Sequence, residues 1–193
     1  MTPVPIMLVG DAPDNVSGLS RILRDLATVL CSCPSFRVAT LGYAGYGSVK
    51  LPFQQYIMQY TPDPIQSLQV SLMQAFEDFT RGEQGICLTV WDATRLHWLA
   101  RPEVVEHDLR LRDWLLNIRT IHRLILWGYI PVDSEGPHGR LTAMTHDTLM
   151  GFDRLIAYTP FGAELIQRTI GPEESFKRGL TWLPHAVGEG FRA

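Results

Sequence analysis

The sequence predicts an α/β protein with a doubly wound, Rossmann-like parallel sheet of about six or seven strands. Apolar runs of strand length alternate with amphipathic segments at a spacing of about 30 residues, which is typical of parallel crossover units. The composition agrees, because 193 residues with 46% hydrophobic and 19% charged residues can bury one domain-sized core.

The first unit, residues 6–30, shows the pattern most clearly. An apolar run, 6–10, is followed by a polar loop, 11–17, and then by apolar residues that recur on one helix face. These apolar residues are Leu19, Ile22, Leu23, Leu26, Ala27 and Leu30. Ser17 is available as the N-cap, so backbone N–H groups and the positive helix end lie at the carboxyl edge of the sheet. Anions bind well at such an edge.

The later elements follow in chain order. We predict strands over 36–42, 56–60, 86–91, 121–127, 154–158 and 180–183. A helix opens at Pro62 and Pro64 and closes at Arg81-Gly82, helical segments contain Trp98 and Trp114, and a short helix covers 141–152. Pro131 keeps the segment 128–133 as a loop. Thr159 is the expected N-cap of a helix that Gly171-Pro172 ends.

Charge and cysteine content narrow the classes of partner. A formal net charge of -3 gives no bulk attraction for nucleic acid, so none is expected as a partner. The segment 101–123 holds five Arg among acidic residues and is read as an ordinary solvated helix face, with peripheral membrane contact or acceptor docking as the alternative. The three cysteines, an odd number, are expected to be free thiols, and no ligand cluster with metal spacing is present, so no metal or cofactor is expected.

Neither a membrane span nor an export signal is apparent. No apolar run reaches the roughly 20 residues that cross a bilayer, and the N-terminus lacks the build of a secretory signal, so a cytoplasmic location is expected. The first loop lacks the glycine spacing of a dinucleotide fingerprint and of a P-loop, and no G-x-S-x-G elbow occurs. Nicotinamide chemistry, ATP hydrolysis and serine hydrolysis therefore lose their main support.

Three motifs in order resemble the N-terminal half of a retaining glycosyltransferase of the B-fold type, the glycogen-synthase-like and sucrose-synthase-like family. They are a small-residue loop opening the first helix, a strand ending in Ser or Thr before a helix that begins Phe-Gly, and a closing strand that runs into a Pro-His motif and a Phe. In this chain they are residues 9–21, 157–162 and 183–187 with Phe191. Together they span almost the whole chain.

The chain departs from the family pattern at two motifs. The paired glycines of the first loop are here Ser17-Gly18, so close backbone approach to a phosphate depends on Gly18 alone. Pro-His-Gly-Val-Asp is here residues 184–188, Pro-His-Ala-Val-Gly. The resemblance implies that 1–183 form the N-terminal domain, that 184–193 begin the interdomain linker, and that the C-terminal donor-binding domain is absent from this chain.

The resemblance also implies the reaction. The complete enzyme would move a sugar from a nucleotide-sugar donor to an acceptor hydroxyl with retention, and this half would supply the acceptor site and part of the diphosphate cradle. We expect it to be inactive alone. Candidate residues follow strand ends: Asp92 as the catalytic residue, with Asp11, Gly18, Tyr129 and Thr159 as substrate-binding residues.

Each candidate also has an ordinary structural interpretation. Asp11 and Asp92 could cap turns, Tyr129 could be an amphipathic rim residue, and Thr159 could be only an N-cap. A stand-alone doubly wound module that binds a nucleotide or a partner without catalysis is the alternative function. A third alternative, a half-transferase completed by a separate chain, predicts an exposed apolar patch around the linker. The oligomeric state is left open.

Overall fold

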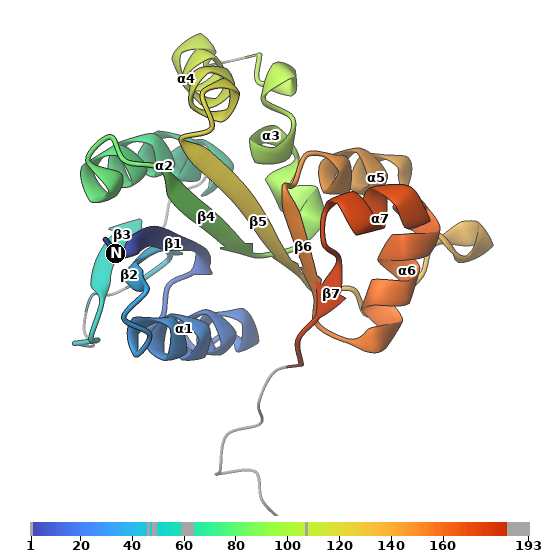
Figure 1. The fold of residues 1–193 in the computed structure, drawn as a ribbon, viewed down its shortest axis with the longest axis horizontal. Helices are drawn as coiled ribbons and strands as arrows, with labels where there is room; N and C mark the ends of the chain where they lie inside the picture. The colour runs from blue at the N-terminus through green and yellow to red at the C-terminus, as the bar shows by residue number, and fades with distance from the viewer. Residues whose placement is uncertain (1, 46, 48–49, 59–63, 107, 185–193) are drawn as a thin grey trace, which may run out of the picture.

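Parallel strands form one sheet in the order β3-β2-β1-β4-β5-β6-β7 (Figure 1). The computed structural model describes residues 2–45, 47, 50–58, 64–106 and 108–184. In this part of the chain the strands are β1 (Val4–Asp11), β2 (Phe36–Tyr43), β3 (Gln54–Met58), β4 (Gly85–Val90), β5 (Leu124–Ile130), β6 (Arg154–Ala157) and β7 (Thr181–Trp182). The predicted doubly wound α/β class is confirmed.

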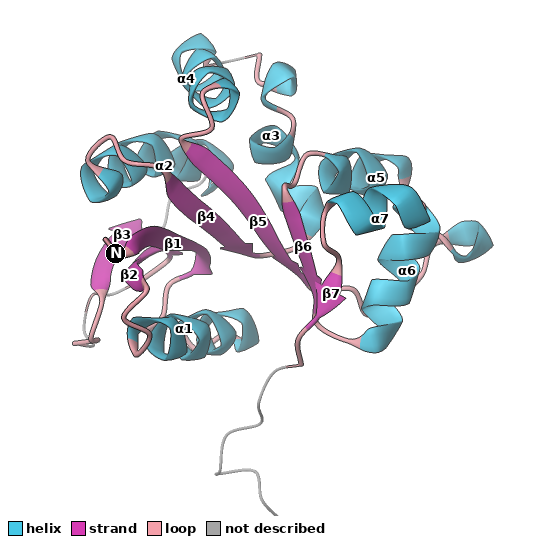
Figure 2. Cartoon of the chain, in the orientation of Figure 1, coloured by secondary structure: helices cyan, strands magenta, loops and turns pink. Residues whose placement is uncertain are grey.

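Helices connect most of the successive strands, as is typical of crossover units, whereas no helix lies between β2 and β3 among the described residues (Figure 2). They are α1 (Gly18–Cys31), α2 (Pro64–Thr80), α3 (His97–Ala100), α4 (Leu109–Thr120), α5 (Ala143–Met150), α6 (Pro160–Ile170) and α7 (Pro172–Lys177). Short 3-10 turns cover Ala93–Leu96, Pro102–Val104 and Pro137–Gly139. Among the described helices, none combines the length and the apolar character needed to cross a bilayer.

The core has two layers, one on each face of the sheet. Along β1, Ile6 and Leu8 join the cluster beneath α1, while Met7 and Val9 join the cluster beneath α2 to α6. All four side chains are fully buried. A central parallel strand covered on both faces must be apolar throughout, which explains the unbroken run at the start of the sequence.

The two predicted helix caps are confirmed. The Ser17 hydroxyl accepts from the backbone N–H of Ser20 at 2.9 Å, and the Thr159 hydroxyl accepts from that of Gly162 at 3.0 Å. Pro160 occupies the first turn of α6, where its missing N–H costs nothing. Both caps lie at the carboxyl edge of the sheet, so the residues before each helix are held close to that edge.

One prediction about element boundaries is wrong, and one short helix, α7, was not predicted. The prediction ended a strand at Trp127 and placed Tyr129 in a loop, but β5 continues to Ile130 because Tyr129 and Ile130 pair in register with Ile156 and Ala157 of β6. Gly171-Pro172 ends α6 but also starts α7, since proline fits the first turn of a helix.

Other expectations are met only in part. The strand expected at 56–60 is β3, and residues 59–60, with Pro62, lie outside the described residues. Most of the proposed linker, 185–193, also lies outside them. Cys31, Cys33 and Cys87 are free thiols, as expected. No cluster of three or more residues suited to a metal ion is found among the described residues.

Candidate functional site

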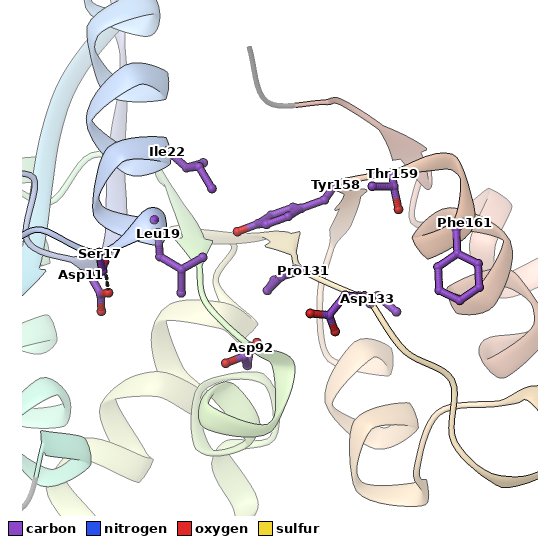
Figure 3. Close-up of a pocket in the computed structure, with 12 residues that line it drawn as sticks. Asp11, Ser17, Leu19, Ile22, Asp92, Pro131, Asp133, Tyr158, Thr159 and Phe161 are labelled. Atoms are coloured by element: carbon purple, nitrogen blue, oxygen red, sulfur yellow. Dashed lines mark hydrogen bonds between the residues drawn. The ribbon is translucent and has the colours of Figure 1, made fainter. Parts of the chain in front are cut away.

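A pocket of about 680 Å³ opens at the carboxyl edge of the sheet (Figure 3). The order of the strands in the sheet reverses between β1 and β4. From β1 the chain runs outward through β2 to β3 on one side, and then from β4 to β7 on the other side. Doubly wound sheets bind ligands at such a switch point. The lining residues come from α1 and from the segments that follow β1, β4, β5 and β6: Asp11, Ser17, Gly18, Leu19, Ile22, Asp92, Pro131, Val132, Asp133, Tyr158, Thr159 and Phe161.

Asp11 organises the corner between β1 and α1. Its carboxylate accepts hydrogen bonds from the Ser17 hydroxyl and, at 2.9 Å, from the indole N–H of Trp91. Because the Ser17 hydroxyl also caps α1, one short chain of bonds joins the end of β1, the end of β4 and the start of α1. Asp11 therefore has a structural role in addition to lining the pocket.

Glycines on β2 and after it make room for this corner. A Cβ on Gly42 would lie 2.4 Å from the Cα of Ala12, and one on Gly45 would lie 2.6 Å from the Ala12 Cβ. Gly18 differs, because a Cβ there would meet nothing within 4 Å. Since Gly18 lines the pocket, the space beside it is available to a ligand.

Asp92 follows the buried Trp91 and faces the pocket (Figure 3). It occupies the N-cap position of the 3-10 turn Ala93–Leu96, but its side chain makes no cap hydrogen bond. Trp91 is held by an edge-to-face contact with Tyr43 and by the guanidinium of Arg95 over its ring. The exposed Asp92 carboxylate thus extends from a rigid base and does not act as a turn cap.

The loops after β5 and β6 form the opposite wall. Asp133 is exposed at this wall, and Tyr158 lies between it and α1 (Figure 3). Burial raises the pKa of Tyr158 well above its usual value, and the nearby groups Tyr129, Asp92 and Asp11 raise it further. Tyr158 is therefore a neutral phenol at physiological pH. Phe161, 41% exposed, extends the apolar part of the wall.

Tyr129 lies behind this wall and not in it. Its side chain is 1% exposed, and its hydroxyl donates to the backbone carbonyl of Leu183 at 2.7 Å. Burial raises its pKa to about 12. The rings of Tyr129 and Tyr158 are 4.4 Å apart between centroids, so Tyr129 supports the ring that does line the pocket.

The structure thus brings four of the five candidate residues to one pocket. Asp11, Gly18, Asp92 and Thr159 line it, and Tyr129 does not. The sequence reasoning did not select Asp133 or Tyr158. The rule that selected Asp92, a polar side chain following a buried strand, finds Tyr158 only when β6 is known to end at Ala157, and Asp133 only when β5 is known to end at Ile130.

The polar lining is acidic. Three of the lining residues are aspartates, and within the described part of the chain no Arg, Lys or His lines the pocket. The hydroxyls of Ser17 and Thr159 complete the polar set, and Tyr158 also lines the pocket although its hydroxyl oxygen is buried. Leu19, Ile22 and Phe161 supply apolar surface. Comparison with protein-family models and with curated proteins finds no match to this chain.

Proposed function

We propose that this chain is the N-terminal, acceptor-side domain of a retaining glycosyltransferase of the B-fold type. The observation that supports it most is the pocket at the switch point. Carboxylates, hydroxyls, and aromatic and aliphatic side chains line this one pocket together. The motif resemblance described above supports the same assignment, because two of its three motifs contribute residues to this pocket. A nucleotide-sugar donor would be bound mainly by a second domain.

The lining suits a sugar acceptor. Carboxylates accept hydrogen bonds from hydroxyl groups, which are the groups that a sugar presents in every direction. Aromatic and aliphatic side chains pack against the carbon-bound faces of the ring. A module that binds free nucleotides has weaker support, since no lining side chain among the described residues is a cation that could pair with phosphate.

Asp92 is the residue that we assign to the acceptor hydroxyl. Its carboxylate is exposed in the pocket and is not used in a cap. A carboxylate in this position accepts the hydrogen bond of the attacking hydroxyl and orients its oxygen, which is the part of the reaction that an acceptor domain must perform. The expected contribution of Gly18 to a diphosphate cradle stays a prediction, since the start of α1 already faces the Asp11–Ser17 pair.

The test is sugar transfer by the longest natural protein that contains this chain. Nucleotide sugars are supplied with a panel of hydroxylated acceptors, and the anomeric configuration of the product is read by NMR. Asp92→Asn should lower kcat by about 100-fold, a loss typical of a group that handles a transferred proton. Asp25→Asn, which removes an equal charge on the outer face of α1, is the control. Absence of transfer with every donor, or full activity of Asp92→Asn, would contradict the proposal.

Gly18→Ala provides a second test that does not depend on charge. The added methyl group meets no protein atom and alanine favours a helix more than glycine does, so thermal stability should not fall. A ligand that packs against residue 18 of the lining would contact the methyl group. We expect the acceptor KM to rise about tenfold, which corresponds to about 1.4 kcal/mol of lost contact. An unchanged KM would place the acceptor away from α1.

A further inference from the structure

We propose that the acceptor carries a cationic amino group in addition to its hydroxyls, as an amino sugar or an aminocyclitol does. This inference depends on the acceptor role proposed above and specifies the chemical class of the acceptor. It is argued from the distribution of charged residues, because acidic residues dominate the pocket lining whereas the chain as a whole has similar numbers of acidic and basic residues.

The negative charge is local to the pocket. The whole chain is close to balanced, with 20 acidic and 17 basic residues. The pocket is not balanced, since Asp11, Asp92 and Asp133 line it and no basic side chain does so among the residues that the structure describes. These three aspartates come from segments after three different strands, so the fold itself gathers them at one edge of the sheet (Figure 3).

The starts of α1 and α6 also border the pocket, and their positive ends offset part of its negative charge. At α1 this positive end lies next to Asp11, which accepts a hydrogen bond from the Ser17 hydroxyl. Asp92 and Asp133 come from loops on the other side of the switch point, and neither forms an ion pair within the described part of the chain. Two carboxylates thus remain for a ligand.

The field of these groups reaches the opposite wall. Burial is the main cause of the raised pKa of Tyr158, and the charges of Asp92 and Asp11 add to it. Figure 3 shows Tyr158 in the same pocket as these two carboxylates. These carboxylates attract a bound cation and repel a phosphate or a carboxylate ligand. The pocket therefore discriminates by charge as well as by shape.

The apolar wall explains why a simple inorganic cation is not the ligand we infer. Leu19, Ile22 and Phe161 face the same space as the carboxylates, and the pocket volume of about 680 Å³ falls within the range of organic ligand sites. Neither is there a cluster of three or more metal-ligating side chains among the described residues. A hydroxylated ring with an ammonium group satisfies the carboxylates, the hydroxyls and the apolar wall together.

The experiment compares ligands that share one carbon skeleton and differ in charge. Glucosamine, N-acetylglucosamine and glucose 6-phosphate are titrated into the chain, and the chemical shifts of backbone amides around the pocket are followed by NMR. We expect binding in the order amine, N-acetylated sugar, phosphate, with no saturation by the phosphate. The affinity for the amine should fall as salt is raised, because screening weakens the ion pair.

Variants assign the effect to the pocket. Asp92→Asn and Asp133→Asn should each weaken binding of the amine by about tenfold, as expected for loss of one charge-assisted hydrogen bond. Neither should change binding of the N-acetylated sugar as strongly. Asp25→Asn, on α1 but outside the lining, should leave both affinities unchanged.

Three results would overturn the inference: a phosphate that binds as tightly as the amine, equal affinities for amine and N-acetylated sugar, or no binding of the amine at millimolar concentration. The outcome is separable from that of the proposed function. Transfer to neutral sugars with no preference for amines would remove only this inference. Selective amine binding without transfer in the longer protein would keep the charge preference and remove the transferase assignment.

Discussion

The two ends of the sheet use charge in opposite ways. At the amino ends of β4 to β6, charged side chains are bonded to the protein: Arg119 donates to the backbone carbonyls of Leu99, Ala100 and Gly151, and Arg123 pairs with Glu77 at 2.7 Å. At the carboxyl ends, Asp92 and Asp133 face a pocket and form no ion pair within the described residues.

This contrast distinguishes charged side chains that are bonded to the protein from charged side chains that can bind a ligand. A buried guanidinium that satisfies three carbonyls links α3, α4 and α5, and burial lowers its pKa because the charged form loses water. An exposed carboxylate without a partner contributes little to stability and remains available to a ligand. Mutations at the two ends should therefore affect different measurements.

The largest effect is expected at Arg119. Arg119→Met keeps the aliphatic stem but leaves three backbone carbonyls without their donor, so the free energy of unfolding should fall by about 3 kcal/mol. Urea denaturation measures the change. Arg112→Met, at a half-buried position of the same helix where the guanidinium pairs only with the exposed carboxylate of Asp113, should cost less than about 0.5 kcal/mol. A loss at Arg119 as small as that at Arg112 would remove the contrast between the two ends.

Asp11 is the exception that sharpens the comparison, since it lines the pocket and is also bonded to the protein. Asp11→Ala leaves the buried indole N–H of Trp91 without an acceptor and should cost about 2 kcal/mol. In a double-mutant cycle, Trp91→Phe should reduce the cost of Asp11→Ala. Additive losses would show that the indole bond contributes nothing to stability.

Glu77 should make the amino end sensitive to acid. Burial opposes ionisation of Glu77, but hydrogen bonds from Arg123 and Trp114 outweigh it and lower the pKa of this carboxyl. A lowered pKa in the folded state stabilises the protein above the ordinary carboxyl pKa, and this contribution is lost as pH falls through the folded value. Glu77→Gln should therefore cost about 1 kcal/mol at pH 7, and the gap to the wild type should close below about pH 4. A gap that is constant with pH would contradict this assignment.

The smallest change in stability is expected at the pocket itself. Asp92→Asn and Asp133→Asn should each alter the free energy of unfolding by less than about 0.5 kcal/mol, and the double variant should be slightly stabilised because repulsion is relieved. The same variants should lose ligand binding. A large loss of stability at either position would make it a structural residue like Asp11.

Local signals in the sequence predicted most of the fold. Ser17 and Thr159 are found as caps because a cap is defined by the residues within one helical turn. The end of β5 was predicted too early because Gly128 and Pro131 favour a loop locally. Pairing with β6 keeps the chain extended to Ile130. That long-range pairing has no local signature. The start of α7 was missed because Pro172 ends one helix and opens the next.

The candidate site residues were likewise predicted where local signals suffice and missed where long-range contacts decide. Asp11, Gly18, Asp92 and Thr159 were found because strand ends converge at one edge of a parallel sheet, whatever the details of packing. Tyr129 was misplaced with its strand, and its burial behind Tyr158 depends on contacts between β5, β6 and Leu183. The acidity of the pocket became visible only when the true end of β5 brought Asp133 to the edge.

The bond between Trp91 and Asp11 joins residues that lie 80 positions apart in the chain. Its proton belongs to an indole, which gives a signal of its own in a nitrogen-edited NMR spectrum, separate from the crowded backbone region. One end of the bond is buried in the core and the other end is a carboxylate that borders the pocket. The molecule therefore contains its own spectroscopic reporter, since a ligand that reaches Asp11 will shift this single resonance.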